Sequence, residues 1–573
     1  MNKKELVEKI NSLDALTTEE KSALIDLLKQ KKYGLVWENK PEDVEERLRA
    51  ELPVLKEVTD KALLDGGEDA PNHILIEGDN LEALTALAYT HENSVDVIYI
   101  DPPYNTGNKD FVYNDSFVDS EDGYRHSKWL SFMDKRLRIA KRLLSDHGVI
   151  FISIDDNEQA NLKLLCDEVF GEEKFVSNFI WKSRQNKDNR NITGVSNDHE
   201  YLVCYTKIQG IRALKGSERK TDQYKNPDND PRGPWTSANM AGILDAEQRP
   251  NCHYDLIDPN TGINYGRPKM GWRYDKNTMK RLIAENRILW PTNPEGRPRK
   301  KSFLSEISVI LPGYSSIVGE DVYTRNGTKI LDDIFEKRPF DYPKPTELIK
   351  ELINQSSKNN STILDFFAGS GTTLHATMQL NAEDGGHRKC ILVTNNENNI
   401  CEEVTYERNK RVINGYTTPK GEEVEGLKAN NLRYYQIDHV ERESSLTAKR
   451  KLMAASAELL CIKHDIYEES TTFGTHKLKP HIARYFSKGD KKMLIIYMVE
   501  AIERIVEEIE TMPEDTNIMV YVFSTNNYAM DADFEDVADK VTLCALPAAI
   551  YNAYLKVLPK KGEPKQIIEE DAE

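Results

Sequence analysis

A short apolar run that ends at two consecutive prolines constrains the fold of this chain more than any other feature of its sequence. The β-branched and aromatic residues of Val95–Ile100 predict a buried strand. Asp101, Pro102, Pro103 and Tyr104 follow directly, and because proline cannot continue a hydrogen-bonded ladder, the chain must turn here. In open α/β sheets, ligands bind at the carboxyl ends of the strands. A carboxylate, rigid peptide carbonyls and an aromatic ring at such a place suit the binding of a flat base that carries an exocyclic amine.

The sequence on both sides of this junction alternates between predicted strands and predicted helices. Strands are predicted at 73–76, 95–100 and 148–154, and helices at 80–89 and 124–144. After a long stretch without this rhythm, a helix at 335–355, a strand at 362–367, a helix at 372–380 and a strand at 389–394 follow. Such alternation predicts a Rossmann-like, doubly wound α/β sheet that one long insert interrupts. A last region carries a predicted helix at 492–510, a strand at 518–524 and a helix at 548–558.

With 573 residues, the chain is too long for one ordinary hydrophobic core. The predicted parts are an N-terminal helical segment at 1–70, an α/β domain formed by 71–180 and 326–425, an insert at 181–325 and a small C-terminal α/β domain at 430–573. No apolar run reaches the roughly 18 residues of a membrane span, and the first residues do not have the pattern of a signal peptide. The seven cysteines form no C-x-x-C pair, which favours reduced thiols over disulfides or zinc. We therefore expect a cytoplasmic protein with no membrane segment.

The charge of the chain is unevenly distributed. The net charge of −18 argues at first sight against nucleic acid as a partner. Residues 181–310, however, hold 23 Lys and Arg against 15 Asp and Glu, so the negative excess lies entirely in the rest of the chain. A basic insert in an acidic chain predicts a surface that faces DNA. The alternative is an unevenly solvated surface with no such partner.

A second motif, far downstream, joins a predicted strand to a predicted helix through small residues. Its candidate cofactor-binding residues are Asp365, Phe367, Ala368, Gly369, Ser370, Gly371 and Thr372. Small residues at such a turn let a nucleotide approach the backbone, but the phosphate-binding pattern G-x-x-x-x-G-K-[ST] is absent. The next predicted strand leads to Glu397, whose carboxylate can bind both hydroxyls of a ribose. An adenosine-bearing cofactor without a phosphate grip points to S-adenosylmethionine, and a purely structural glycine turn is the alternative.

Together, the two motifs resemble those of the amino-DNA methyltransferases of the β arrangement, in which the catalytic tetrad precedes the cofactor turn. More particularly, the chain resembles the modification subunit of a type III restriction–modification system. The motifs that carry this resemblance lie at 32–38, 76–80, 101–107, 197–201, 327–329 and 342–345. The resemblance implies a circularly permuted methyltransferase sheet, a target-recognition domain in the insert, and a C-terminal domain for dimerisation or partner docking.

The resemblance also implies a role for each candidate residue. Asp101, Pro102, Pro103 and Tyr104 would form the catalytic tetrad. Around S-adenosylmethionine, Phe367, Ala368 and Gly369 would approach the amino-acid part, Glu397 would hold the ribose, and Lys344 and Pro345 would close over the methionine end. Asp79 would touch the adenine of the cofactor, or would instead cap the helix that follows it. No metal is expected in the site.

The chemistry of the tetrad suits the N6 amine of adenine, a poor nucleophile whose lone pair is delocalised into the ring. Asp101 and the Pro102 carbonyl can accept its two N–H groups, and Tyr104 can stack on the base once it has been flipped out of the duplex. Positioning of the reactants then supplies much of the rate. Transfer to cytosine C5 would need a nucleophilic cysteine, commonly in a Pro-Cys step, and no Pro-Cys step occurs in the sequence. Cytosine N4 methyltransferases more often place Ser before Pro-Pro-Tyr, so Asp101 favours adenine.

We therefore expect a bacterial or archaeal, site-specific DNA-adenine methyltransferase that acts on double-stranded DNA. Its expected partners are a second copy of itself, in a homodimer, and a helicase–nuclease restriction subunit. An orphan methyltransferase and a catalytically silent DNA-binding or assembly subunit are the alternatives. Three local questions also stay open: whether His199 contacts the base or only supports the site, whether the insert tryptophans are core residues or stack on bases, and whether the cations of 124–144 are solvated or contact phosphates.

Overall fold

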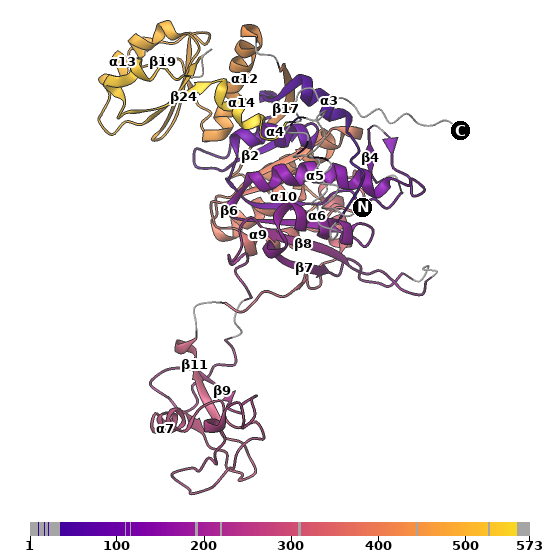
Figure 1. Cartoon of the computed structure of the whole chain (residues 1–573), viewed down its shortest axis with the longest axis vertical. Coiled ribbons are helices and arrows are strands. Elements are labelled where there is room, and N and C mark those ends of the chain that lie inside the picture. The colour runs from indigo at the N-terminus through magenta and orange to yellow at the C-terminus, as the bar shows by residue number, and fades with distance from the viewer. Residues whose placement is uncertain are drawn as a thin grey trace. The chain divides into compact units, whose positions relative to one another are not determined.

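The computed structural model describes residues 35–558 except 109, 115, 189–192, 218–220, 308–310, 443–444 and 525–527, and in addition residues 10, 17 and 21. The helices predicted within residues 1–34 lie almost entirely outside the described residues. The chain divides into two compact units, one formed by Met1–Leu214 with Ser316–Glu573 and the other by Lys215–Ser315 (Figure 1). Among the described residues, no helix is long and apolar enough to cross a membrane.

The first unit is built around a ten-stranded sheet with the order β1-β17-β2-β14-β13-β3-β6-β8-β7-β12. In that order the strands are β1 (Glu51–Glu57), β17 (Asn431–Glu441), β2 (Asn72–Glu77), β14 (Lys389–Thr394), β13 (Thr362–Asp365), β3 (Val95–Ile100), β6 (Leu144–Ile154), β8 (Glu200–Thr206), β7 (Phe175–Trp181) and β12 (Ile317–Val318). The six strands from β17 to β6 are parallel to one another, whereas β1 and β8, which flank them, are antiparallel to β17 and β6. This arrangement confirms the predicted α/β sheet. It places β13 between β14 and β3, although β13 and β3 are far apart in the sequence.

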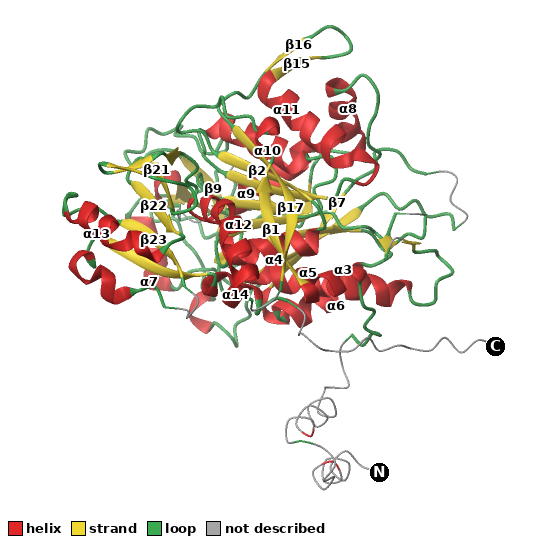
Figure 2. Cartoon of the chain, turned by 90° about the horizontal axis from the view of Figure 1, so that it is seen from above, coloured by secondary structure: helices red, strands yellow, loops and turns green. Residues whose placement is uncertain are grey.

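Helices cover both faces of this sheet, as expected for a doubly wound fold (Figure 2). One side carries α3 (Asp43–Ala50), α4 (Asn80–Thr90), α5 (Arg125–Leu143) and α6 (Gln159–Phe170), and the other carries α8 (Thr324–Ile334), α9 (Thr346–Ser356), α10 (Thr372–Asp384) and α11 (Glu407–Asn414). The helix α5 illustrates how the sequence sets this packing. Trp129, Met133, Leu137 and Ala140 recur at helical spacing on one stripe, and all four are buried.

Two predicted helices differ from the structure. Only the second half of the helix predicted at 335–355 is helical: α9 begins at Thr346, and the preceding helix, α8, ends at Ile334, before the predicted start. Pro343 and Pro345 lie between them, and proline disfavours helical backbone both at its own position and at the residue before it. The helix predicted at 492–510 begins instead with a strand, β22 (Lys491–Ile496), and α13 covers only Ile502–Glu510. The apolar run in β22 is buried in a sheet, which its periodicity alone did not reveal.

The C-terminal region contributes to the central sheet and also forms a smaller one. The smaller sheet has the order β18-β21-β22-β23-β24, with β18 (Glu469–Ser470), β21 (Ala483–Lys488), β23 (Ile518–Phe523) and β24 (Val541–Leu546) beside β22. Two helices, α12 (Leu446–His464) and α14 (Ala548–Tyr554), pack on α4, and α12 also packs on β1. The hydroxyl of Tyr554 donates to the Pro53 carbonyl at 2.7 Å. Short strand pairs complete the unit: β4 (Val112–Tyr113) with β5 (Ser116–Phe117), β15 (Gly415–Thr417) with β16 (Glu423–Glu425), and β19 (Thr472–Phe473) with β20 (His476–Lys477).

The observed boundaries differ from those drawn on the sequence. The strand β1 lies within the segment predicted to be helical, and β17 lies beyond the predicted end of the α/β domain, yet both belong to the central sheet. The strand β8 belongs to that sheet as well, so the second compact unit is Lys215–Ser315 rather than 181–325. An apolar strand pattern signals burial but does not say which sheet the strand joins, which explains all three differences.

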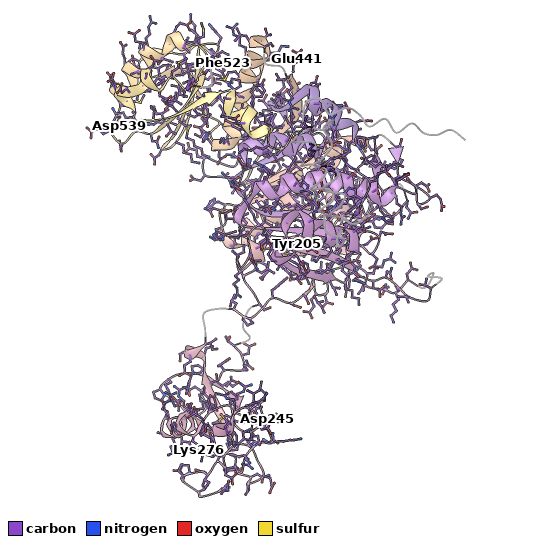
Figure 3. The ribbon with its side chains drawn as sticks, viewed as in Figure 1. Tyr205, Asp245, Lys276, Glu441, Phe523 and Asp539 are labelled. Atoms are coloured by element: carbon purple, nitrogen blue, oxygen red, sulfur yellow. The ribbon has the colours of Figure 1, made fainter. Side chains whose placement is uncertain are left out.

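The second unit has its own small core. Its sheet consists of β10 (Ile288–Leu289), β11 (Arg299–Phe303) and β9 (Trp235–Asn239), and its helix is α7 (Lys276–Ala284), which begins at the Lys276 labelled in Figure 3. Trp272 is 3% exposed and donates its indole N–H to the Tyr254 carbonyl at 2.9 Å. Trp272 is therefore a core residue, as one of the two open alternatives held. Trp235, at the edge of the sheet, donates instead to the Asp228 carboxylate at 2.8 Å.

Candidate active site

The predicted catalytic motif and the glycine turn meet at one edge of the central sheet. Asp101 follows the last residue of β3, and Asp365 is the last residue of β13. These two strands are hydrogen-bonded and parallel, with Ile363 opposite Val97. Their carboxyl ends therefore lie side by side, although the two motifs are far apart in the sequence. Only this strand order brings them together.

Buried neighbours hold the loop after β3 in place. The Trp129 indole N–H, from α5, donates to the Pro103 carbonyl at 2.7 Å. The Asn105 amide donates to Glu158 Oε1 at 2.5 Å, and both residues are fully buried. The Pro103 carbonyl therefore already has one donor, and the binding of the base amine by the Pro102 carbonyl stays a prediction.

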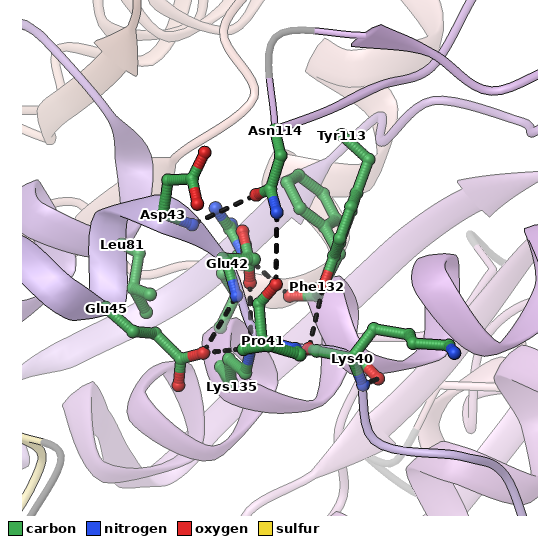
Figure 4. Close-up of polar contacts among 12 residues, drawn as sticks. Lys40, Pro41, Glu42, Asp43, Glu45, Leu81, Tyr113, Asn114, Phe132 and Lys135 are labelled. Atoms are coloured by element: carbon green, nitrogen blue, oxygen red, sulfur yellow. Dashed lines mark hydrogen bonds and ion pairs between the residues drawn. The ribbon is translucent and has the colours of Figure 1, made fainter. Parts of the chain in front are cut away.

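The chain after this loop is also tied down, through the β4–β5 hairpin and the segment ahead of α3 (Figure 4). The Tyr113 hydroxyl donates to the Lys40 carbonyl at 2.7 Å, and the Asn114 side chain accepts from the Asp43 backbone N–H at 3.0 Å. The predicted catalytic loop, residues 101–105, is thus anchored by hydrogen bonds of its own and by those of the hairpin that follows it.

A lysine joins the predicted catalytic aspartate to a second acid. Lys344 Nζ lies 3.2 Å from Asp101 Oδ1 and 2.8 Å from Glu200 Oε2. The Tyr104 hydroxyl donates to the same Glu200 oxygen at 2.8 Å and accepts from Lys344 Nζ at 2.7 Å. We call these four residues, Asp101, Tyr104, Glu200 and Lys344, the acid–lysine cluster. It combines a tetrad residue pair, the first residue of β8 and a residue of the segment before α9.

The charges in the acid–lysine cluster depend on one another. Burial raises the pKa of Asp101, and the Lys344 charge opposes this rise in part. Burial also acts to raise the pKa of Glu200, but the Lys344 ammonium outweighs it and lowers that pKa below its usual value. For Lys344, burial acts to lower the pKa, and the carboxylates of Asp101 and Glu200 reverse the effect and raise it. The ammonium and the Glu200 carboxylate therefore stabilise each other as ions.

The glycine turn has the shape expected for a close backbone approach. Asp365 anchors it from the strand side: its Oδ1 accepts from the Phe367 N–H at 3.0 Å and its Oδ2 from the Thr373 hydroxyl at 2.5 Å. Burial raises the pKa of this carboxyl to about 7. Gly369 and Gly371 both have left-handed backbone, with φ of +48° and +74°. A Cβ at Gly371 would lie only 2.5 Å from Asn409, whereas one at Gly369 would make an ordinary contact at 3.4 Å, so a Cβ has room at Gly369 but not at Gly371.

A fully buried arginine supports this turn from behind. Arg408 donates to the Ser370 carbonyl at 3.2 Å and to the Thr372 hydroxyl at 2.8 Å. The Thr405 hydroxyl donates to the Gly369 carbonyl at 2.5 Å. Neither Arg408 nor Thr405 was predicted as a site residue. Their positions in a helical stretch beyond Glu397 gave no signal, because an arginine in such a place is ordinarily exposed.

The amino-acid sequence also matches known proteins. The profile of a family described as DNA methylase matches residues 95–416, a range that spans the catalytic loop, the insert and the glycine turn. The chain belongs to this family. Its relatives include the StyLTI Mod subunit of a type III restriction-modification enzyme from Salmonella typhimurium, which is 36% identical over 56% of this chain and 52% of its own. The EcoP15I Mod subunit from Escherichia coli is 30% identical over 68% of each chain.

A third relative of this DNA methylase is the type II methyltransferase M.KpnI from Klebsiella pneumoniae, 34% identical over 61% of this chain and 87% of its own. The present chain thus spans about half of the StyLTI subunit but most of M.KpnI. The family match confirms the resemblance inferred from the two motifs.

Two predicted cofactor residues of the methylase lie at the same edge of the sheet. Asp79 caps α4, because its Oδ1 accepts from the Leu81 N–H at 2.7 Å and the Glu82 N–H at 3.3 Å. The helix-cap alternative is therefore confirmed, and a contact of Asp79 with a cofactor stays a prediction. Glu397 follows β14, begins a short 3₁₀ turn and is exposed. Its role at a ribose likewise stays a prediction.

Lys344 and Pro345 connect the catalytic loop to the glycine turn. The Thr372 hydroxyl donates to the Lys344 carbonyl at 3.3 Å, and Pro345 is the N-cap residue of α9. The backbone at this point also packs tightly on α8, since a Cβ at Gly327 would lie 2.3 Å from the Pro343 carbonyl oxygen. The segment predicted to close over the cofactor therefore also delivers the ammonium of the acid–lysine cluster.

Two further readings of the sequence can be compared with the structure. His199 contacts the Tyr201 ring edge-on at 4.9 Å, and it is the next residue, Glu200, whose side chain enters the acid–lysine cluster. The side chains of neighbouring residues in a strand point to opposite faces of the sheet, so His199 and Glu200 are not expected to enter the same site. Glu200 lay inside a recognised motif and was overlooked as a candidate.

Five cations of α5 are paired with acids. Ion pairs join Lys128 to Asp122, Lys135 to Glu45, Arg136 to Glu42, Arg138 to Asp134 and Arg142 to Glu92. Lys141 donates to the Val169 carbonyl at 2.7 Å. The cations of this helix therefore do not all lie on a solvated face, because Arg136 is fully buried.

Proposed function

We propose that this DNA methylase transfers a methyl group from S-adenosylmethionine to N6 of adenine in double-stranded DNA, after the base has been flipped out of the duplex. The observation that carries the proposal is the position of Asp101 and Asp365 at the carboxyl ends of the paired parallel strands β3 and β13. A base amine held by the first motif and a cofactor held by the second would meet there. Ligands of open α/β sheets bind at this kind of edge.

The glycine turn fits S-adenosylmethionine. A Cβ would have room at Gly369, so a ligand could approach the backbone there, and both carboxyl oxygens of Asp365 accept hydrogen bonds within the turn. Phe367, Ala368 and Gly369 would hold the amino-acid part, and Ser370, Gly371 and Thr372 complete the turn. Glu397 would hold the ribose, Asp79 would touch the adenine, and Lys344 and Pro345 would lie over the methionine end. When bound, S-adenosylmethionine supplies a methyl group on a positively charged sulfur.

The residues of the catalytic loop would orient the acceptor. Asp101 and the Pro102 carbonyl accept the two N–H groups of the amine, which directs the nitrogen lone pair away from the ring. Pro102 and Pro103 keep the loop rigid, and Tyr104 stacks on the base. The activation free energy of methyl transfer would thereby be lowered mainly through positioning.

We further propose that the protein is the modification subunit of a type III restriction–modification system, as its StyLTI and EcoP15I relatives are named. It would then form a homodimer and work with a helicase–nuclease restriction subunit in the cytoplasm of a bacterium or archaeon. The unit Lys215–Ser315 would read the target sequence, and the region after β17 would serve dimerisation or docking. The high coverage of M.KpnI, a type II methyltransferase, favours one alternative, an enzyme that works without such a subunit.

The test is transfer of a labelled methyl group from S-adenosylmethionine to duplex DNA, with the product identified as N6-methyladenine. Asp101→Ala should abolish transfer and leave DNA binding largely unchanged. Full activity of that variant, or a label found on cytosine, would contradict the proposal. A restriction subunit that co-purifies with the protein and cleaves DNA would separate the type III system from the orphan enzyme.

A further inference from the structure

We propose that Lys344 is a positioning residue for methyl transfer: it balances Asp101 against Glu200, so that Asp101 stays an ionised acceptor for the base amine. Glu200 is the second positioning residue, because it holds the lysine between the two acids. This inference rests on the proposed function and adds to it a role for two side chains outside the tetrad.

The contacts of the ammonium are unequal, and this matters for Asp101. Lys344 Nζ donates hydrogen bonds to Glu200 and to the Tyr104 hydroxyl, at 2.8 and 2.7 Å. Asp101 Oδ1 lies 3.2 Å away from the same nitrogen, but it is buried and makes no hydrogen bond to any described residue. A buried carboxylate oxygen without a hydrogen bond costs free energy and is ready to accept a donor. The base amine is a donor of the required kind.

The fold keeps Lys344 in this position. Its side chain is only 10% exposed and lies over the rings of Tyr104 and Trp181, at 4.9 and 5.7 Å from their centroids. Such cation–aromatic contacts stabilise a cation without neutralising it. Its carbonyl accepts from Thr372 of the glycine turn, so a single residue links the cofactor side of the site to the amine side.

The groups around Asp101 come from five places in the fold. They are Tyr99 of β3, Tyr104 of the catalytic loop, Glu200 of β8, Lys344 before α9 and Asp365 at the end of β13. Lys344 is the cation of this group, and both other carboxyls favour the protonated form of Asp101. Protonated Asp101 has lost part of its acceptor capacity, so the balance of these charges decides over which pH range the amine can be held.

Opposite consequences follow for two substitutions. In Lys344→Met the cation is lost, the pKa of Asp101 rises, and methyl transfer should fail at a higher pH than in the wild type. In Glu200→Gln one negative charge is lost, the pKa of Asp101 falls, and the acidic limit of transfer should move to lower pH. If the two substitutions merely loosened the site, they would not move the acidic limit of methyl transfer in opposite directions.

The experiment compares the pH dependence of kcat and KM for DNA in the wild type, Lys344→Met, Lys344→Arg and Glu200→Gln. Lys350→Met is the matched control, because Lys350 lies on α9 and pairs only with the exposed Glu383 among the described residues. We expect the acidic limit to rise by about one to three pH units in Lys344→Met, to fall in Glu200→Gln, and to stay in place in the control. In Lys344→Arg, the acidic limit should lie close to that of the wild type, because the positive charge is kept. Shifts of equal sign, or no shift in either variant, would overturn the proposal.

A second measurement does not depend on activity. In protein labelled with ¹³C at the aspartate carboxyl, the Asp101 resonance is assigned by its loss in Asp101→Asn, and its titration is followed by NMR. The midpoint should rise in Lys344→Met and fall in Glu200→Gln. If the wild type transfers no methyl group but these shifts occur, the proposed function fails and the charge balance stands. If the midpoint is the same in all variants, the charge balance itself is wrong.

Discussion

The indole N–H of Trp129 donates to the Pro103 carbonyl at 2.7 Å and thereby joins the N-terminal part of α5 to the loop after β3. Trp129 itself is completely buried. The neighbouring Asn105–Glu158 bond holds the next turn of the loop. Two rigid prolines, the partly buried Trp129–Pro103 hydrogen bond and the buried Asn105–Glu158 bond together order the loop before a base arrives, which reduces the ordering that binding must supply.

Trp129→Phe should slow methyl transfer while leaving the fold intact. Phenylalanine fills most of the same space but cannot donate to Pro103, so that carbonyl loses its partner. We expect about 1–3 kcal/mol of lost stability, measured by urea denaturation, and a reduced kcat with an unchanged KM for S-adenosylmethionine. Trp272→Phe is a control, since it removes a similar buried indole bond within the second unit. An unaltered kcat in Trp129→Phe would show that the loop is ordered without this bond.

Gly371→Ala should prevent cofactor binding. Gly371 and Gly385 both have left-handed backbone, with φ of +74° and +68°, so alanine strains both positions. Only at Gly371 would the new Cβ also collide, at 2.5 Å from Asn409, whereas nothing lies within 4 Å at Gly385. Calorimetric titration with S-adenosylmethionine should therefore detect binding in Gly385→Ala but not in Gly371→Ala. Equal binding in both variants would mean that the glycine turn is only structural.

Asp365→Asn should flatten the pH dependence of stability. Burial raises the pKa of this carboxyl to about 7, against about 4 in an unfolded chain. Between these values the folded protein holds a proton that the unfolded chain releases, so the free energy of unfolding falls as the pH rises from about 4 to about 7. The loss is up to about 1.4 kcal/mol per pH unit. Urea denaturation of both proteins at pH 5 and pH 8 checks this. A difference between them that does not depend on pH would contradict the assignment.

Replacement of residues 215–315 by a short Gly-Ser linker should abolish sequence-specific DNA binding but preserve S-adenosylmethionine binding. This unit forms its own core and sheet, and the cations of 181–310 outnumber the acids. The intact protein should bind DNA more weakly as salt increases, despite its net charge of −18, because cations that contact phosphates release counterions. Fluorescence anisotropy with a labelled duplex measures both effects. Retained binding of the same site would place recognition elsewhere in the chain.

A chain that ends at residue 430 should not fold properly. The sequence suggested that a separate domain begins there, but such a chain would lack β17, which lies between β1 and β2 in the central sheet. It would also lack α12 and α14, which cover α4. We expect aggregation or a strongly lowered Tm by calorimetry, not a soluble monomer. A soluble, cofactor-binding product would mean that the C-terminal region is an independent unit, and its oligomeric state could then be measured directly.

Local patterns were sufficient to predict the catalytic loop and the glycine turn. The strand Val95–Ile100 ends where proline follows it, and the helix α10 begins just after Gly371, as predicted. These features depend on a few adjacent residues, whose backbone preferences do not need the rest of the fold. Prediction was less accurate where two local patterns were both possible. The residues of β22 were predicted as part of a helix, because a short apolar run does not distinguish a strand from a helix. The helix predicted at 335–355 was drawn through the prolines that lie between α8 and α9.

The sequence by itself determined that the chain turns after Ile100 and that a glycine turn follows β13, since proline, glycine and β-branched residues restrict the backbone wherever they occur. It did not determine that Glu200 and Lys344 would meet at Asp101, or that Arg408 would support the glycine turn. Those contacts join residues that are far apart in the chain. They arise only when β13 is placed between β14 and β3, because the pairing order of strands depends on the packing of the whole sheet and not on any one segment.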